Sequence, residues 1–148
     1  MPVQKIKYNS KEYKEAVALR NLILRQPLGL RLDKKDLVKE EHDIHIGCFE
    51  EHQLVGTLVM TAIDRDTVKI RQVAVAEDHQ RKGIGRALMT FAEKIAKKHE
   101  FSNITLNART SALPFYLKMG YTTVGKEYIS KNTNLPHFKM TKHIPMEK

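Results

Sequence analysis

The chain has 148 residues, of which 41% are hydrophobic and 29% are charged, proportions that are typical of a globular protein. This length fits a single domain with a substantial core, and the one cysteine excludes an intramolecular disulfide. No apolar run approaches the roughly 20 residues of a membrane-spanning helix, and the first residues lack the apolar segment of a signal peptide. We therefore expect a cytoplasmic protein without a membrane partner.

The formal net charge of +9 favours anionic ligands, and nucleic acid is the first of these to consider. The basic residues, however, are scattered along the chain, without a block of about five or six like charges and without a recognisable nucleic-acid motif. A solvated basic surface is therefore the better interpretation, and we expect no nucleic-acid partner.

The first half of the chain predicts four strands and two helices. Apolar residues alternate with polar ones in the first strand and recur every three to four residues in the first helix. The expected strands are 3–8, 44–50, 54–62 and 68–76, and the expected helices are 13–24 and 33–39. Between the two helices, Pro27 and Gly29 predict a loop from Arg25 to Leu32.

The second half predicts a long amphipathic helix, because Ile84, Leu88, Phe91 and Ile95 share one helical face in a segment that ends near His99. The other expected elements are a strand at 102–106, a helix at 111–119, and strands at 121–128 and 138–143. The order β-α-α-β-β-β-α-β-α-β-β predicts an α/β (α+β) fold. Its sheet is expected to be mixed and mainly antiparallel, with about six or seven strands flanked by about four helices.

The segment between the fourth strand and the long helix, here termed the basic loop, has the features of an anion-binding site. Its residues are Gln80, Arg81, Lys82, Gly83, Ile84, Gly85 and Arg86. The first N–H groups of a helix lack intrahelical acceptors, glycines let an anion approach the backbone, and basic side chains add positive charge. The segment lacks the P-loop pattern, and Leu88 replaces the third glycine of the dinucleotide-binding fingerprint. It therefore predicts a pyrophosphate site of another kind.

The pattern Q-x-x-G-x-G from Gln80 to Gly85, after a strand that reads V-A-V, resembles the coenzyme A signature of the GNAT superfamily of N-acetyltransferases. Two further segments resemble the family: L-N-A-R at 106–109 and P-F-Y-L-K-M-G-Y at 114–121. The element order is also that of the GNAT fold, so the resemblance covers residues 1–148 as one GNAT-like acetyltransferase domain. The segments 24–30 and 135–140 look like a branch of small bacterial GNAT proteins whose substrates are mostly unassigned.

This resemblance implies acetyl-CoA as the cofactor. It places the pyrophosphate on the backbone N–H groups of residues 81–86 and the pantetheine arm along the backbone of Val73 and Val75. The N–H group of Val73 would polarise the acetyl carbonyl as an oxyanion-hole donor. Asn107, which we expect directly after the fifth strand, is either a coenzyme A contact or a turn residue before the next helix.

The resemblance also assigns Tyr116 as the general acid that protonates the leaving thiolate, although an aromatic core residue is the alternative. Many relatives carry a glutamate on the fourth strand as the general base, but here residues 67–76 contain no acidic side chain. The remaining candidates for the base are Glu41, His45 and His137, or an ordered chain of water molecules. Each has an ordinary alternative, since Glu41 fits a solvated loop and a histidine on a strand is often structural.

Four arginines are candidates to line the acceptor site: Arg25, Arg31, Arg71 and Arg109. A positive pocket would suit an acceptor that carries a carboxylate or phosphate beside its amine. No metal site is expected, and the oligomeric state stays open, a homodimer included.

The leading hypothesis is an acetyl-CoA-dependent N-acetyltransferase that transfers the acetyl group directly to a primary amine of a small molecule. One alternative is acetylation of a protein amine. A second is a GNAT-like domain that binds coenzyme A without turnover, which the absence of a carboxylate from the fourth strand favours. A basic nucleic-acid-binding module is the third, and it predicts binding that weakens steeply with salt.

Overall fold

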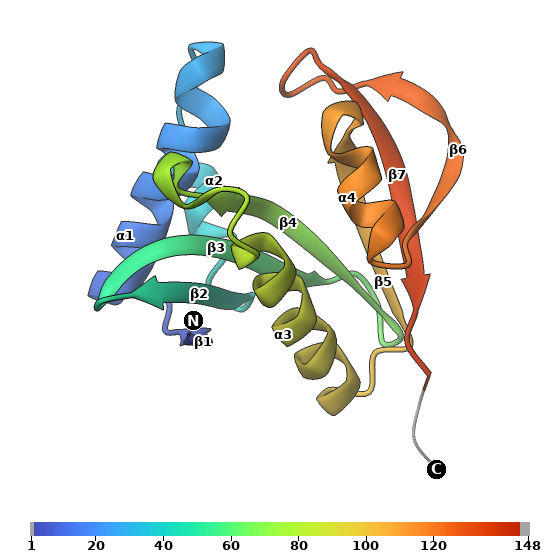
Figure 1. Cartoon of the computed structure of the whole chain (residues 1–148), viewed down its shortest axis with the longest axis horizontal. Coiled ribbons are helices and arrows are strands. Elements are labelled where there is room, and N and C mark those ends of the chain that lie inside the picture. The colour runs from blue at the N-terminus through green and yellow to red at the C-terminus, as the bar shows by residue number, and fades with distance from the viewer. Residues whose placement is uncertain (1, 146–148) are drawn as a thin grey trace. The chain divides into compact units, whose positions relative to one another are not determined.

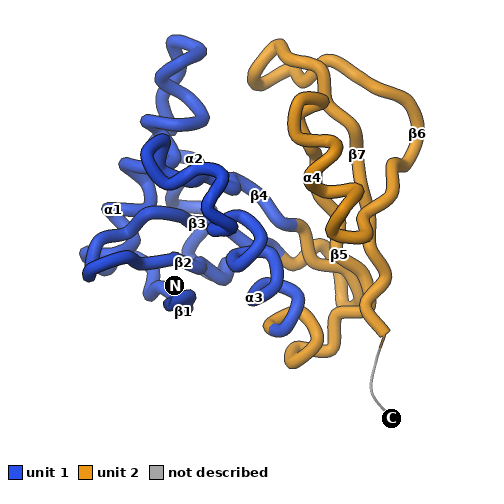
Figure 2. The backbone as a smooth tube through the Cα atoms, in the orientation of Figure 1, with its two compact units in different colours: residues 1–61, 70–94 blue, residues 62–69, 95–148 orange. Residues whose placement is uncertain are grey.

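The computed structural model describes residues 2–145, and Figure 1 shows the order of its elements. The chain forms two compact units, which Figure 2 distinguishes by colour. The first unit comprises the residues up to Thr61 together with Ile70–Lys94. The second comprises Ala62–Lys69 and the residues from Ile95 onward. The strand β4 (Thr67–Val75) and the helix α3 (Ile84–Lys98) each begin in one unit and end in the other.

Within residues 2–145, seven strands form the sheet, in the order β1-β2-β3-β4-β5-β7-β6. The strands are β1 Val3–Ile6, β2 Ile44–Glu50, β3 Gln53–Ala62, β4 Thr67–Val75, β5 Asn103–Arg109, β6 Thr122–Ile129 and β7 Pro136–His143. The pairs β1–β2, β2–β3, β5–β7 and β6–β7 are antiparallel. Four α-helices accompany them within residues 2–145: α1 Lys11–Arg20, α2 Lys34–Val38, α3 Ile84–Lys98 and α4 Leu113–Lys118. The predicted fold class is confirmed.

In the first unit, α1 packs its apolar face on the sheet. Ser10 caps the helix by accepting a hydrogen bond from the N–H group of Tyr13 at 3.1 Å. The buried core cluster of this helix and the neighbouring strands consists of Ile6, Tyr13, Ala16, Leu19, Leu54 and Ala74. The single cysteine, Cys48, is fully buried in β2, opposite Val3 of β1. Beyond Arg20 the chain continues as a π-helical turn, so the helix predicted to reach residue 24 changes its hydrogen-bond pattern there.

The start of α3 lies very close to β3, and Gly56 is the reason. A Cβ atom at this position would lie 2.8 Å from Cγ2 of Ile84 and 3.0 Å from Cδ1 of Leu88. Both of these apolar residues are fully buried, as the amphipathic pattern predicts. The glycine thus sets how close the first turns of α3 come to the strand, and this helix start carries the basic loop.

In the second unit, β7 lies between β5 and the edge strand β6. All eight residues of β6 are exposed, and its register against β7 shifts between Val124 and Tyr128. The strand β5 extends to Arg109, three residues further than predicted. Asn107 therefore lies inside β5, opposite Lys139 of β7, and the prediction that it follows the strand is wrong. The antiparallel ladder with β7 continues over L-N-A-R and keeps this segment extended.

Among residues 2–145, no helix combines the length and the apolar character that crossing a membrane requires.

Candidate active site

The basic loop leaves the end of β4 through a short 3₁₀ turn, Glu77–His79, and is tied to the strand by one side chain. Nε2 of Gln80 donates a hydrogen bond to the carbonyl oxygen of Val75 at 3.1 Å. Arg81 and Gly83 have φ angles of 65° and 83°, in the left-handed region of the backbone. Glycine adopts this conformation without a steric penalty, so Gly83 gives the loop its shape and leaves its surface free of a side chain.

Six backbone N–H groups of the basic loop, those of residues 81–86, are available to an anion. The first backbone hydrogen bond of this helix start runs from the N–H group of Ala87 to the carbonyl oxygen of Gly83, at 3.0 Å. Before it, the N–H groups of residues 81–86 donate to no acceptor within residues 2–145. The exposed basic side chains of the loop, likewise, form no ion pair within the described part of the chain: Arg81, Lys82 and Arg86. Unpaired donors, partial positive charge and full positive charges fit a diphosphate group.

The strand that leads into the loop is irregular at Gln72. This residue has a φ angle of 56°, and its buried Oε1 atom has no hydrogen-bond partner among residues 2–145. On either side of it, Arg71 and Val73 are partly buried, as is Val75 at the strand end. The residues whose backbone is expected to meet the pantetheine arm thus follow directly on the irregularity.

A buried ionic group, here termed the Glu40 cluster, lies in the first unit; its members are Tyr13, Arg20, Glu40, Asp43 and Arg71. Arg20 forms a bidentate ion pair with Glu40, with Nη1 2.8 Å from Oε1 and Nη2 2.6 Å from Oε2. The Tyr13 hydroxyl donates to Oε1 of Glu40 at 2.9 Å. The side chains of Arg20 and Glu40 are 1% and 2% exposed, so this pair lies in the core.

Arg71 joins the cluster from β4. Its Nη1 atom donates to Oγ1 of Thr61 at 3.1 Å and lies 3.6 Å from Oδ2 of Asp43. Its Nη2 atom lies 3.7 Å from Oε2 of Glu40. Two arginines thus face two carboxylates, and the charge of Arg71 is offset. A positive acceptor pocket was one reason to single out Arg71, and this geometry weakens that reason.

The protonation of the cluster follows from burial and charge. Burial alone would raise the pKa of Glu40, but the hydrogen bonds and charge of Arg20 outweigh it, with smaller contributions from Tyr13 and Arg71, and the pKa is lowered. Burial, together with the hydrogen bond to Glu40 and its charge, raises the pKa of Tyr13 well above its ordinary value. The carboxylate is therefore held ionised and the phenol neutral.

The candidate bases of the first unit have opposite environments. His45 is 3% exposed, and its Nε2 atom lies 2.9 Å from the carbonyl oxygen of Glu40. The Glu41 side chain is 58% exposed and lies 3.8 Å from Nε2 of His42. Glu41 is a candidate base from the sequence, whereas its buried neighbour Glu40 was not predicted to have a role. A usable signal was Arg20, which stands seven residues after Tyr13 on the buried face of α1 and needs an internal counter-charge.

The second unit contains the remaining candidates. Tyr116 of α4 is 8% exposed, and its ring packs edge-on against Phe115 and Tyr121, with ring centroids 5.0 Å and 6.0 Å away. Burial raises the pKa of Tyr116 to about 12. Its hydroxyl group has no hydrogen-bond partner among residues 2–145. The phenol is therefore protonated over a wide pH range and has a proton to donate.

His137 is 7% exposed in β7, and its Nδ1 atom lies 2.9 Å from the carbonyl oxygen of Leu135. A carbonyl oxygen only accepts, so Nδ1 carries the proton and, in the neutral ring, Nε2 keeps the lone pair. Arg109 stands opposite His137 in the β5–β7 register, which brings these two candidates together. Of the other arginines, Arg25 ends the π-helical turn and Arg31 is exposed.

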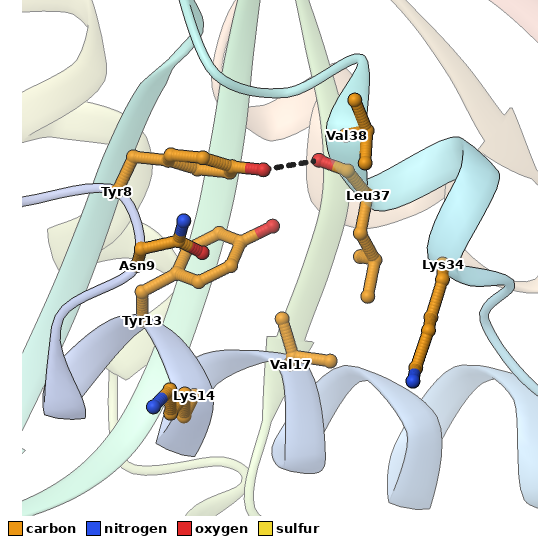
Figure 3. A pocket seen from close by; sticks show the side chains of 8 residues that line it. All are labelled: Tyr8, Asn9, Tyr13, Lys14, Val17, Lys34, Leu37 and Val38. Atoms are coloured by element: carbon orange, nitrogen blue, oxygen red, sulfur yellow. Dashed lines mark hydrogen bonds between the residues drawn. The ribbon is translucent and has the colours of Figure 1, made fainter.

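A separate pocket opens between α1 and α2, with a volume of about 370 Å³. Figure 3 shows the rings of Tyr8 and Tyr13 at one end and Lys34 at the other. The Tyr8 hydroxyl donates to the carbonyl oxygen of Leu37 at 3.1 Å. None of the residues that line this pocket belongs to β4 or to the basic loop. Within residues 2–145, no three His, Cys, Asp or Glu side chains are grouped so that they could hold a metal ion.

Known proteins resemble this chain both in sequence and in structure. Residues 22–144 match the family model of the acetyltransferase (GNAT) domain. The uncharacterised protein YyaT of Bacillus subtilis (strain 168) is 30% identical over 112 residues, which cover 76% of this chain and 73% of that protein. The uncharacterised N-acetyltransferase YjcF of the same organism is 28% identical over 135 residues, 90% of this chain and 94% of that protein.

An aminoglycoside 6'-N-acetyltransferase complexed with coenzyme A superposes with a TM-score of 0.82 over 100% of this chain and 99% of that one. Its sequence identity is 16%, so this likeness concerns the fold. The family match spans both compact units and includes the whole basic loop. The predicted family, the cofactor and the enzyme class are thereby confirmed: the chain belongs to the GNAT family of N-acetyltransferases, which use acetyl-CoA.

Proposed function

We propose that this protein transfers the acetyl group of acetyl-CoA directly to a primary amine of a small molecule. The observation that carries the proposal is the basic loop, where unpaired backbone N–H groups, a glycine at positive φ and three exposed cations lie together. These groups would hold the diphosphate of the cofactor, and the bound thioester supplies the activated acetyl group. The aminoglycoside acetyltransferase of the same fold supports a small-molecule acceptor.

In the transfer, the amine nitrogen attacks the thioester carbonyl carbon, a C–N bond forms and the C–S bond breaks. The amine loses one proton to a base, and the leaving thiolate takes up one proton. We assign the second proton to Tyr116, because its hydroxyl group is protonated and has no acceptor within the described chain. The N–H group of Val73 remains the proposed donor to the carbonyl oxygen in the transition state.

We assign the base to His137 among the three side-chain candidates. The carbonyl oxygen of Leu135 fixes the tautomer of its ring, so that Nε2 is the atom that can accept a proton. His45 is tied to the backbone of Glu40 deep in the first unit, and Glu41 is a solvated carboxylate. The test compares pH–rate profiles of His137→Gln, His45→Gln and Glu41→Gln. Loss of the acid limb in His137→Gln alone supports the assignment, and unchanged profiles in all three favour a water relay.

Cofactor binding is tested first, by calorimetry with acetyl-CoA. Gly83→Val places a branched side chain on the loop surface and should weaken binding at least tenfold. Gly125→Val is the matched control, because Gly125 also has a positive φ angle, 78°, but lies in the exposed strand β6. Equal affinity of both folded variants would place the diphosphate elsewhere.

Transfer is tested by release of free thiol from acetyl-CoA with a panel of amines. Turnover with small primary amines supports the proposal, whereas turnover with peptides alone favours a protein amine acetyltransferase. Tight binding without thiol release from any amine favours a domain that only binds coenzyme A.

The cytoplasmic location and the single-domain assignment of residues 1–148 remain predictions.

A further inference from the structure

Gln72 is the residue of β4 whose backbone and side chain both depart from ordinary strand geometry. Several non-glycine residues between 2 and 145 have a positive φ angle, but Gln72 alone among them lies inside a strand or helix. The others lie in turns and loops, where the left-handed conformation is common. Residues held in such a conformation within a regular element cluster at binding and catalytic sites, because the surrounding structure must hold them there.

The side chain of Gln72 is unusual as well, independently of its backbone. Its Oε1 atom is shielded from solvent and accepts no hydrogen bond from residues 2–145. Buried polar atoms in native proteins are nearly always paired, so each exception needs an explanation. A donor that is not part of this chain would supply the missing hydrogen bond.

The neighbours of Gln72 narrow the chemistry of that donor. On one side, Arg71 is held by Thr61, Asp43 and Glu40, so its charge is already balanced. On the other side lies Val73, the proposed oxyanion donor. Gln72 thus directly precedes the proposed oxyanion donor in β4, and its carboxamide oxygen is a neutral acceptor without a partner among residues 2–145. A carboxylate there would favour the ammonium form of an amine, which cannot attack, whereas a carboxamide accepts an N–H bond with a weaker pull on the proton.

We propose that Gln72 binds the acceptor amine, with Oε1 accepting a hydrogen bond from the N–H that stays on nitrogen during transfer. This inference rests on the proposed function. A primary amine has two N–H bonds: one proton leaves with the base, and the other remains in the amide product. A secondary amine has one N–H bond and loses it, so it leaves Oε1 unpaired at the end of the reaction. Gln72 thus selects primary over secondary amines.

The test compares matched pairs of amines that differ by one N-methyl group: glycinamide with sarcosinamide, and tyramine with N-methyltyramine. The ratio of kcat/KM within each pair is measured by thiol release for the parent and for two variants. Gln72→Leu keeps the approximate size and removes the acceptor. Gln72→Gly also removes the acceptor but tolerates the positive φ angle, so it keeps the test valid if the leucine variant does not fold.

We expect the parent to prefer the primary amine of each pair, and both variants to lose roughly 10- to 100-fold of that preference. The affinity for acetyl-CoA, measured by calorimetry, should stay within about twofold of the parent value. If the role of Gln72 were purely structural, the kcat/KM ratios of the two variants would change in different directions. Gln72→Leu retains the backbone strain, whereas Gln72→Gly relieves it.

A parental preference that persists in both variants would overturn the role of Gln72 and leave the proposed function intact. Failure of the parent to bind acetyl-CoA would instead overturn the proposed function. If the parent binds acetyl-CoA but transfers to none of these amines, both the small-molecule transfer and the role of Gln72 are wrong, and the cofactor site stands.

Discussion

At the scale of single residues, the Glu40 cluster shows how a buried charge is made tolerable. Removing a carboxylate and a guanidinium from water is costly, and their attraction offsets this cost only when the geometry is good and other donors are satisfied. The geometry of Glu40 is good, with a bidentate contact to Arg20 and a third hydrogen bond from Tyr13, although Nε of Arg20 is buried without a partner among residues 2–145. Removal of one partner should therefore lower the free energy of unfolding by more than the net contribution of the intact pair.

We expect Glu40→Gln to lower the free energy of unfolding by about 3–5 kcal/mol, because it leaves the Arg20 charge buried without a counter-charge. Urea denaturation measures this change. Glu41→Gln is the matched control, with the same chemistry on an exposed neighbour, and should stay within about 0.5 kcal/mol of the parent. Similar losses in both variants would contradict the buried ion pair.

The pH dependence of the free energy of unfolding should also report the ion pair of Glu40. The pKa of Glu40 is lowered in the folded protein, so folding favours the ionised carboxylate. Its contribution is present above the ordinary carboxyl value of 4.5 and is lost as the pH falls through the lowered folded value. Glu40→Gln should therefore lose less stability than the parent between neutral and acid pH, measured by denaturation at each pH. Parallel curves for parent and variant would contradict the lowered pKa.

Tyr116 offers a prediction about chemistry at the same scale. Tyr116→Phe keeps the packing against Phe115 and Tyr121 but removes the proton donor. General acids typically contribute about 10²- to 10⁴-fold, so kcat should fall by that amount while acetyl-CoA affinity barely changes. Single-turnover measurements ensure that the chemical step is observed. A near-parental rate there would leave Tyr116 as a core residue.

At the scale of elements, the parts of β3, β4 and α3 that belong to the first unit present the basic loop. Gly56 permits the close contact of β3 with Ile84 and Leu88, and the side chain of Gln80 ties the loop to the end of β4. The N–H groups that we propose to bind the diphosphate are thus held by packing on one side and by a hydrogen bond on the other. This support matters because a binding group loses affinity when its orientation is not fixed.

Gly56→Ala tests this support. The new Cβ atom would overlap Ile84 and Leu88, and we expect a loss of about 1–3 kcal/mol in stability together with a severalfold loss of acetyl-CoA affinity. Gly29→Ala is the control, because Gly29 has a positive φ angle of 71° and open space around it. That variant is expected to lose stability through backbone strain and to keep its affinity. Equal affinity in the Gly56 variant would show that the loop tolerates movement of α3.

The elements were largely predictable from the sequence, whereas their special positions were not. Periodicity places α3 correctly, because a helix repeats its apolar face over many residues. The positive φ angle of Gln72 has no such repeating pattern in the sequence. Asn107 was misplaced because a local pattern does not tell how far the ladder with β7 continues. The buried ion pair of Glu40 was not predicted, because the adjacent acids Glu40 and Glu41 have the same local signal and only the tertiary fold decides which one meets Arg20.

At the scale of the whole molecule, the formal net charge of +9 and the anionic cofactor suggest long-range attraction. The charge is spread widely, so most of it adds to the encounter rate and to solubility rather than to affinity. The basic loop is the place where positive charge and oriented N–H groups act together. Binding should therefore depend on salt far less steeply than nucleic-acid binding would.

Saturating acetyl-CoA should stabilise the whole protein through this site. At a concentration about 100 times the dissociation constant, binding adds about 2.7 kcal/mol, which corresponds to a rise in Tm of about 5–10 °C for a chain of this size. Calorimetry or a thermal shift assay measures this rise in Tm. The same amount of a duplex DNA fragment should leave Tm unchanged, and a comparable shift with DNA would restore the nucleic-acid hypothesis.

Because of the position of Cys48, the protein itself should contribute little signal to an assay of free thiol. Cys48 is the only cysteine of the chain, it is fully buried in β2, and burial raises the pKa of its thiol. A colorimetric thiol reagent should therefore count the coenzyme A released during turnover without counting the protein. The low reactivity of the buried thiol also makes Cys48 a probe of local unfolding, because an alkylating reagent can reach it only when the β2 region opens. The mass increase of one adduct per chain, followed over time, would measure how often that opening occurs.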